Sequence, residues 1–62
     1  MANEMIREEL KEKKVYQWEL AHALGISEQT MVRRMRFEMD EDEQWRLLAL
    51  INEIAMHKED AH

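Results

Sequence analysis

Four polar side chains near the start of one segment could recognise nucleobases by hydrogen bonding. The segment from 28 to 36 places them at spacings that fall on the outward side of a helix. A glutamine can pair with adenine N6 and N7, an arginine can pair with guanine O6 and N7, a threonine can offer a methyl or hydroxyl group, and a glutamate can accept from cytosine N4. The candidates for base contacts are Glu28, Gln29, Thr30 and Arg33.

A second set of cationic and amide side chains is better suited to phosphate, which Lys, Arg and Gln bind without reading sequence. The candidates for phosphate contacts are Gln17, Lys13, Lys14, Arg34 and Arg36. For Gln29 and Arg33 the alternative is an ordinary solvated face, because any surface helix shows a polar outward stripe. For Glu28 the alternative is a favourable interaction with the positive end of the helix dipole.

Catalytic and metal chemistry have little support in this sequence. The chain has no cysteine, so it has no thiolate nucleophile, disulfide or thiolate metal site. His22, His57 and His62 do not stand three or four residues apart, and Ser27 is explained as a helix cap. The acidic run at 40–43 lacks the alternating oxygen ligands and central glycine of a calcium loop. We therefore predict no catalytic residue, metal site, cofactor or small-molecule substrate.

The elements that must position these side chains are all expected to be helices. Proline is absent, glycine occurs once, and the abundant residues favour helices. We predict one all-α domain over residues 1–62, a compact four-helix domain with helices at about 4–13, 17–24, 28–36 and 41–57. The residues expected to form its buried stripes are Ile6, Leu10, Val15, Leu20, Ala21, Leu24, Ile26, Met31, Met35, Leu47, Leu48, Ile51, Ile54 and Ala55.

Helix ends are predicted from capping residues. Gly25 can take the positive φ of a sharp turn, and Ser27 can accept a backbone N–H to start the next helix. Asn3 is the candidate cap of the first helix, and Asp40 with Glu43 has the spacing of a capping box. The polar tail at 58–62 is expected to fray.

The segment from 6 to 35 resembles the phage repressor and Cro family of helix-turn-helix domains. The resemblance is carried by Ile-Arg-Glu-Glu-Leu at 6–10, Gln-Trp-Glu-Leu-Ala at 17–21, and Leu-Gly-Ile-Ser at 24–27 followed by Thr30 and Met31. It implies a central helix-turn-helix at about 17–36 that binds double-stranded DNA with its second helix in the major groove. It also implies that Gln17 contacts a phosphate and that Glu28, Gln29, Thr30 and Arg33 lie near base edges.

Three residues depart from the family pattern. Tyr16 stands where the family usually has a Ser or Thr cap, so another residue must cap the helix after it. Phe37 and Glu38 follow the third helix, where the family often turns on a glycine. Met35 occupies a place where many members carry Glu.

The net charge of −5 favours a second functional class. Up to residue 36 seven Lys and Arg stand against six Asp and Glu, whereas from residue 37 two stand against eight. If the last helix packs behind the others, its acidic start faces away from DNA. The alternatives are an acidic adaptor or anti-repressor that binds a protein, and one subunit of a larger complex that binds DNA without its own specificity.

The two tryptophans also leave alternatives open. Trp45, Ala49 and Met56 share a flank of the last helix and are candidates for a homodimer surface; otherwise the Trp45 ring rests on Phe37 or Met39. Trp18 either packs at the edge of the core or is a partly exposed contact.

No apolar run could span a membrane or form a signal peptide, so we expect a cytoplasmic protein without a membrane partner.

Overall fold

The computed structural model describes residues 2–60, and the side chains of residues 2–58. The chain is all-α over these residues, as predicted, with four helices and no strand. The helices are α1 (Glu4–Lys13), α2 (Gln17–Leu24), α3 (Glu28–Arg34) and α4 (Glu41–Asp60). The predicted bounds of α1 and α2 are confirmed. The prediction for α3 was two residues too long, and α4 runs three residues further than expected.

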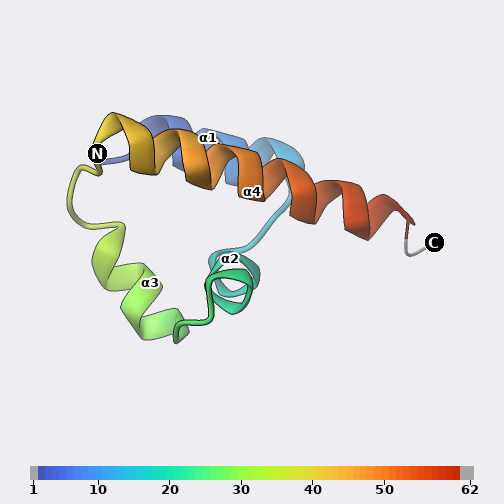
Figure 1. Cartoon of the computed structure of the whole chain (residues 1–62), viewed down its shortest axis with the longest axis horizontal. Coiled ribbons are helices and arrows are strands. Elements are labelled where there is room, and N and C mark those ends of the chain that lie inside the picture. Colours follow the sequence, from blue (N-terminus) through green and yellow to red (C-terminus); the bar gives the residue numbers. More distant parts are fainter. Residues whose placement is uncertain (1, 61–62) are drawn as a thin grey trace.

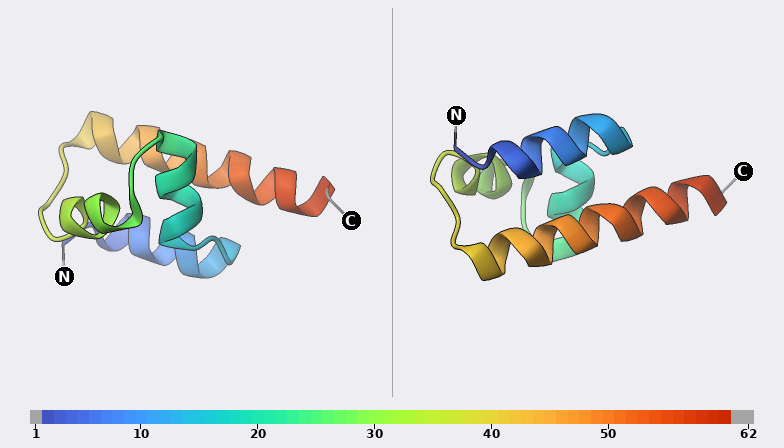
Figure 2. Two further views of the ribbon diagram at one scale, coloured as in Figure 1. Left: turned by 90° about the horizontal axis from the view of Figure 1, so that it is seen from below. Right: turned by 90° about the horizontal axis from the view of Figure 1, so that it is seen from above.

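The helices form two layers. Helices α1 and α4 lie side by side and run in the same direction, and α2 and α3 lie on one side of that pair (Figure 1). The two views of Figure 2 show α3 beside α2 and transverse to it, and the last turns of α4 extending past α1. Helix α4 packs against α1 and α2. The outer face of α3 is consequently left uncovered by the long C-terminal helix.

The core forms where the apolar stripes of the helices meet. Each helix contributes neighbours on one face, because residues one helical turn apart point the same way. The buried core residues are Ile6, Leu10, Val15, Leu20, Ala21, Met31, Met35, Leu47 and Ile51. Leu24, Ile26, Leu48, Ile54 and Ala55 were also predicted to be core and are only partly buried. The Trp18 side chain is 55% exposed, which favours the partly exposed alternative.

The turn between α2 and α3 has the predicted geometry. Gly25 adopts a φ of +73°, and the N–H of Ile26 donates to the carbonyl of Ala21 at 3.0 Å. Ser27 Oγ accepts from the N–H of Thr30 at 3.1 Å and so caps α3. A side chain at position 25 would meet no neighbouring atom, so glycine is needed there for its backbone conformation and not for space.

Two other helix starts are capped by carboxylates. Asp40 Oδ1 accepts from the N–H of Glu43 at 2.8 Å, which confirms Asp40 as the cap of α4. At the start of α2, Glu19 Oε1 accepts from the N–H of Tyr16 at 3.0 Å. This bond is the half of a capping box that satisfies the backbone N–H of the residue before α2, and the Tyr16 side chain makes no cap bond to the first turn.

Asn3 is the N-cap residue of α1, as predicted, but its side chain does not make the cap bond. Asn3 takes a left-handed conformation with φ of 60° and makes no side-chain bond to α1. Its fully buried amide instead donates to the carbonyls of Met35 at 3.2 Å and Phe37 at 2.8 Å, and its Oδ1 accepts from the N–H of Met39 at 2.9 Å. One side chain therefore satisfies three backbone groups in the connection from α3 to α4.

Two further groups complete this contact. The backbone N–H of Asn3 donates to the Glu38 carboxylate at 2.7 Å. The Arg7 guanidinium donates to the Met35 carbonyl and to the Ala2 carbonyl, both at 2.9 Å. Because the C-terminal carbonyl of Met35 is bound by α1 and its N-terminal turn, α3 ends earlier than its sequence predicts and needs no glycine there.

We expect Asn3→Ala to lower the free energy of unfolding by about 3 kcal/mol, because it leaves buried backbone groups without partners. Asn3→Asp keeps the acceptor for Met39 but loses both N–H donors, so we expect it to destabilise to a similar degree. Asn52→Ala removes an exposed asparagine and should change stability by less than about 0.5 kcal/mol. Urea unfolding followed by circular dichroism measures all three, and equal stability of Asn3→Ala and Asn52→Ala contradicts this account.

Candidate nucleic-acid interface

The outward face of α3 brings together most of the residues predicted to contact bases. A shallow depression on this face is lined by Glu28, Gln29, Val32, Arg33 and Arg36. All five side chains are exposed. None of the four polar ones has a hydrogen bond or ion pair within the described part of the chain. Donors and acceptors on this face are therefore free to bind a ligand.

Two of the predicted contact residues, Thr30 and Arg34, do not line this depression. Thr30 is partly buried, and its Oγ1 accepts from the Ser27 hydroxyl at 2.9 Å, so it belongs to the cap of α3. Arg34 is exposed but does not line the depression. Arg36, predicted for phosphate, follows the end of α3 and does line it.

Val32 was missed by the sequence prediction. Its side chain is 40% exposed in the middle of the polar face of α3. The signal was present in the spacing, because position 32 falls between 28–29 and 33–36 on one side of a helix. The prediction weighed only polar residues and so passed over this apolar one.

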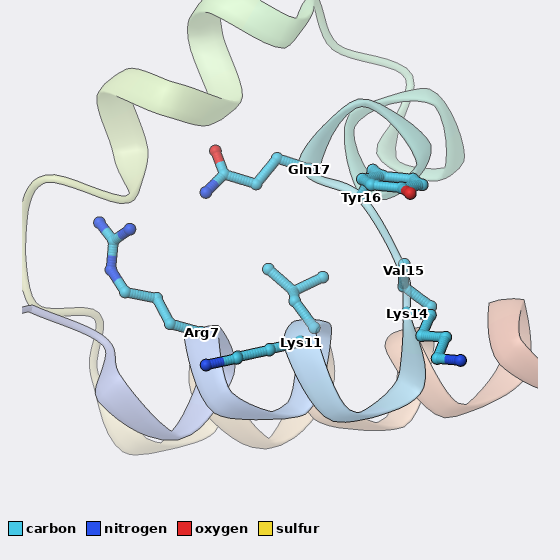
Figure 3. A pocket seen from close by; sticks show the side chains of 7 residues that line it. Arg7, Lys11, Lys14, Val15, Tyr16 and Gln17 are labelled. Carbon is cyan, nitrogen blue, oxygen red and sulfur yellow. The ribbon is translucent and has the colours of Figure 1, made fainter.

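A second groove lies between the C-terminal half of α1 and the start of α2. Its lining residues are Arg7, Leu10, Lys11, Lys14, Val15, Tyr16 and Gln17. In Figure 3 Arg7 and Gln17 extend from α1 and α2 toward the same space, on the side where α3 lies. The structure thus groups two of the predicted phosphate contacts, Gln17 and Lys14, with two cations that the prediction missed.

The missed cations had a recognisable pattern. Arg7 and Lys11 are about one helical turn apart, which puts these two cations on one flank of α1, and Lys14 follows directly after the helix. Lys13, by contrast, was predicted to contact phosphate; it is exposed and does not line the groove.

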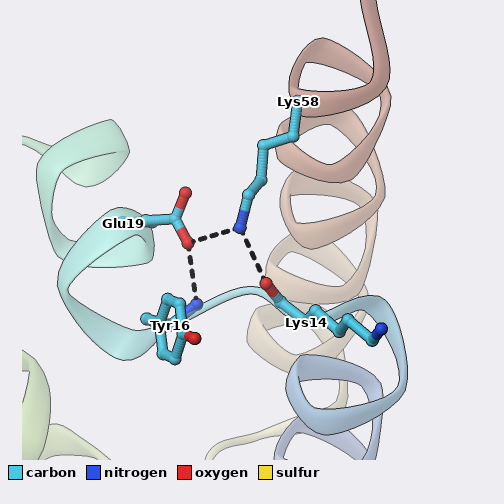
Figure 4. Close-up of polar contacts among 4 residues, drawn as sticks. All are labelled: Lys14, Tyr16, Glu19 and Lys58. Carbon is cyan, nitrogen blue, oxygen red and sulfur yellow. Dashed lines mark hydrogen bonds and ion pairs between the residues drawn. The ribbon is translucent and has the colours of Figure 1, made fainter. Parts of the chain in front are cut away.

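The turn that carries Lys14 and Gln17 is fixed by the C-terminal part of α4. Lys58 Nζ donates to the Lys14 carbonyl at 2.7 Å and to Glu19 Oε1 at 2.9 Å, and it lies 5.4 Å from the centre of the Tyr16 ring (Figure 4). The expectation that the tail frays from residue 58 was wrong at Lys58, because this side chain has partners on α1 and α2. Residues 61 and 62 of that tail lie outside the described part.

These contacts change the pKa of the Glu19 carboxyl. Its partial burial on its own would raise its pKa, but the N–H of Tyr16 together with the hydrogen bond and charge of Lys58 lowers the pKa of Glu19 below its ordinary value of 4.5. The folded protein therefore prefers Glu19 ionised.

Comparisons of the chain with models of protein families, with curated proteins and with solved structures give no match. In the part of the chain that the structure describes, no helix is both long and apolar enough to cross a membrane. Within the same residues no three His, Cys, Asp or Glu side chains gather as a metal site would require.

The three candidates for a homodimer surface are all exposed on α4. The Trp45 side chain is 59% exposed and lines a groove with α1 residues, and Ala49 and Met56 are exposed further along the helix. The dimer stays a prediction, since exposure alone does not identify what covers a surface.

We expect Lys58→Met to lower the free energy of unfolding at neutral pH by roughly 0.5–1 kcal/mol, since Lys58 is partly exposed. Because the pKa of Glu19 is lowered on folding, its contribution is present above its ordinary pKa and is lost as the pH falls through the lowered value. The difference between Lys58→Met and wild type should therefore shrink in acid. Urea unfolding at neutral pH and at a pH below the lowered pKa of Glu19 tests this. Lys13→Met, which removes an exposed lysine outside this contact, is the control. A penalty that is unchanged in acid rules out the Glu19 ion pair as its cause.

Proposed function

We propose that the chain is a sequence-specific DNA-binding transcriptional regulator of the phage or mobile-element type, with α3 as the helix that enters the major groove. The observation that carries this proposal is the outward face of α3. It presents an amide, a carboxylate and two guanidinium groups side by side, and none of them is bound by its own neighbours within the described residues. Side chains of these types read base edges.

The charges around this face support the same proposal. The groove at the start of α2 adds Arg7, Lys11 and Lys14 near Gln17, and Arg34 is exposed on α3. Phosphate contacts at such positions fix the register of a protein on a duplex. Most of the acidic residues lie instead in the segment from 37 onward. The net charge is therefore a poor guide to the potential that DNA would meet at α3.

Individual roles follow from side-chain chemistry. Gln29 is suited to adenine and Arg33 to guanine, and Glu28 could accept from cytosine N4. Thr30 can offer its methyl group, although its hydroxyl oxygen already accepts a bond from Ser27. Arg36 comes after the last turn of α3, so we assign it to phosphate.

The deciding experiment is binding to random duplexes at about 50 mM salt, a salt titration, and then selection of preferred sites. A DNA binder should lose affinity linearly in log salt as counterions are released. On the selected site, Arg33→Ala should lose about 1–3 kcal/mol of binding free energy and relax the preference for one base. Arg36→Ala should weaken binding to all sequences alike and reduce the slope of log affinity against log salt.

Two results would contradict these assignments. Absence of salt-dependent binding removes the DNA proposal and leaves the second candidate, an acidic adaptor or anti-repressor, which the net charge of −5 favours. Equal, sequence-independent losses from Arg33→Ala and Arg36→Ala would leave DNA binding intact but remove the base-reading role of Arg33.

We expect Val32 to contact a thymine. Its exposed apolar side chain lies among polar side chains suited to base contacts, and it can cover the C5-methyl group of that base. Replacing the contacted thymine by deoxyuridine should weaken wild-type binding about fourfold, the effect of ~0.8 kcal/mol for one buried methyl group. Val32→Ala should bind the two duplexes alike. The control Met5→Ala, which shortens an exposed side chain outside this face, should keep the wild-type penalty. An undiminished penalty in Val32→Ala would assign the methyl contact to another residue.

A further inference from the structure

Helix α1 carries opposite charges on its two flanks. Arg7, Lys11 and Lys14 line the groove beside the start of α2. Met5, Glu8, Glu9 and Glu12 line a different groove, on the side of α4. Apart from Lys14, which follows the helix, both sets follow helical spacing, and the buried Ile6 and Leu10 lie between them on the third side of α1. The acidic flank is therefore separate from the surface proposed to meet DNA.

The acidic flank borders an apolar surface shared by α1 and α4. Trp45 and Leu48 of α4 complete the groove, which has a volume of about 330 Å³. Met5 is 51% and Trp45 59% exposed, so two large apolar side chains lie open to solvent next to each other. Neighbouring exposed apolar side chains framed by polar ones are typical of interaction surfaces. The space suits a few side chains of a partner better than a large ligand.

The carboxylates at the rim have no counter-charge of their own. Within the described residues none of Glu8, Glu9 and Glu12 forms a hydrogen bond or an ion pair. Their charges therefore add to one local negative potential beside the apolar groove. A second copy of the chain bound here about a two-fold axis would bring two such rims together, and like charges in contact oppose binding.

We propose that the groove formed by Met5, Trp45 and Leu48, with its rim of Glu8, Glu9 and Glu12, binds a basic amphipathic helix of a partner protein. The apolar side chains of that helix cover Trp45 and Met5, and its lysines or arginines pair with the three carboxylates. In this mode of binding, the groove recognises apolar side chains that recur every three or four residues along the bound helix. The surface is available whether or not DNA is bound, and its test needs no DNA.

The test uses the isotope-labelled full chain and a synthetic helical peptide with leucines on one face and lysines on its flanks. Amide chemical shifts locate the binding, and titration gives the affinity. The shifts should cluster at the lining residues of α1 and α4. The double variant Glu8→Gln with Glu12→Gln should weaken binding about fivefold. The double variant Asp42→Asn with Glu53→Gln removes the same charge from exposed positions outside the groove and should change affinity less than about twofold.

Separate arms test the apolar part and the alternative occupant. Trp45→Ala should weaken binding without altering the circular dichroism spectrum, and a peptide of the same composition in scrambled order should bind more weakly. Equal weakening by the two double variants, shifts centred on the run at 40–43, or no binding at all overturns the proposal. Sedimentation of the free chain that shows a dimer, lost in Trp45→Lys, would assign the groove to a second copy instead.

Discussion

The buried amide of Asn3 is the contact on which the arrangement of this small domain most depends. It joins the first residues of the chain to the end of α3 and the start of α4, and its side chain uses both donors and its acceptor on backbone groups. A buried amide is expensive unless it is satisfied, so this site allows one geometry and penalises others. A chain without a glycine after α3 thereby obtains a defined path into its last helix.

This contact also determines how α3 is presented. Its N-terminus is capped locally by Ser27, and its C-terminal carbonyl group at Met35 is held by Asn3 and Arg7 from the other layer. The buried Met31 and Met35 then turn the opposite side of α3 outward. A helix fixed at both ends and on one face offers its remaining side chains, among them Gln29 and Arg33, in a constant orientation. Binding that depends on geometry requires such preorganisation.

The sequence predicts those parts of the fold that local interactions decide. The bounds of α1 and α2 and the turn at Gly25 follow from spacing and from residues within a few positions of each helix end. The early end of α3, the role of Asn3 and the contacts of Lys58 could not be predicted, because each depends on groups far along the chain. The same division holds for the interface. Glu28, Gln29 and Arg33 are grouped by helical periodicity, whereas Arg7 and Gln17 line one groove only because α1 and α2 both pack against α4.

The long sequence separation of the Asn3 contacts has a consequence for the order in which the chain can fold. The bonds of its side chain join residues 32 to 36 positions apart, whereas the turn between α2 and α3 closes over a few residues. Closing a long loop costs more entropy than closing a short one, so distant contacts are favoured only after local ones have formed. During synthesis Asn3 must therefore wait until residue 39 has been made before it can take its native place.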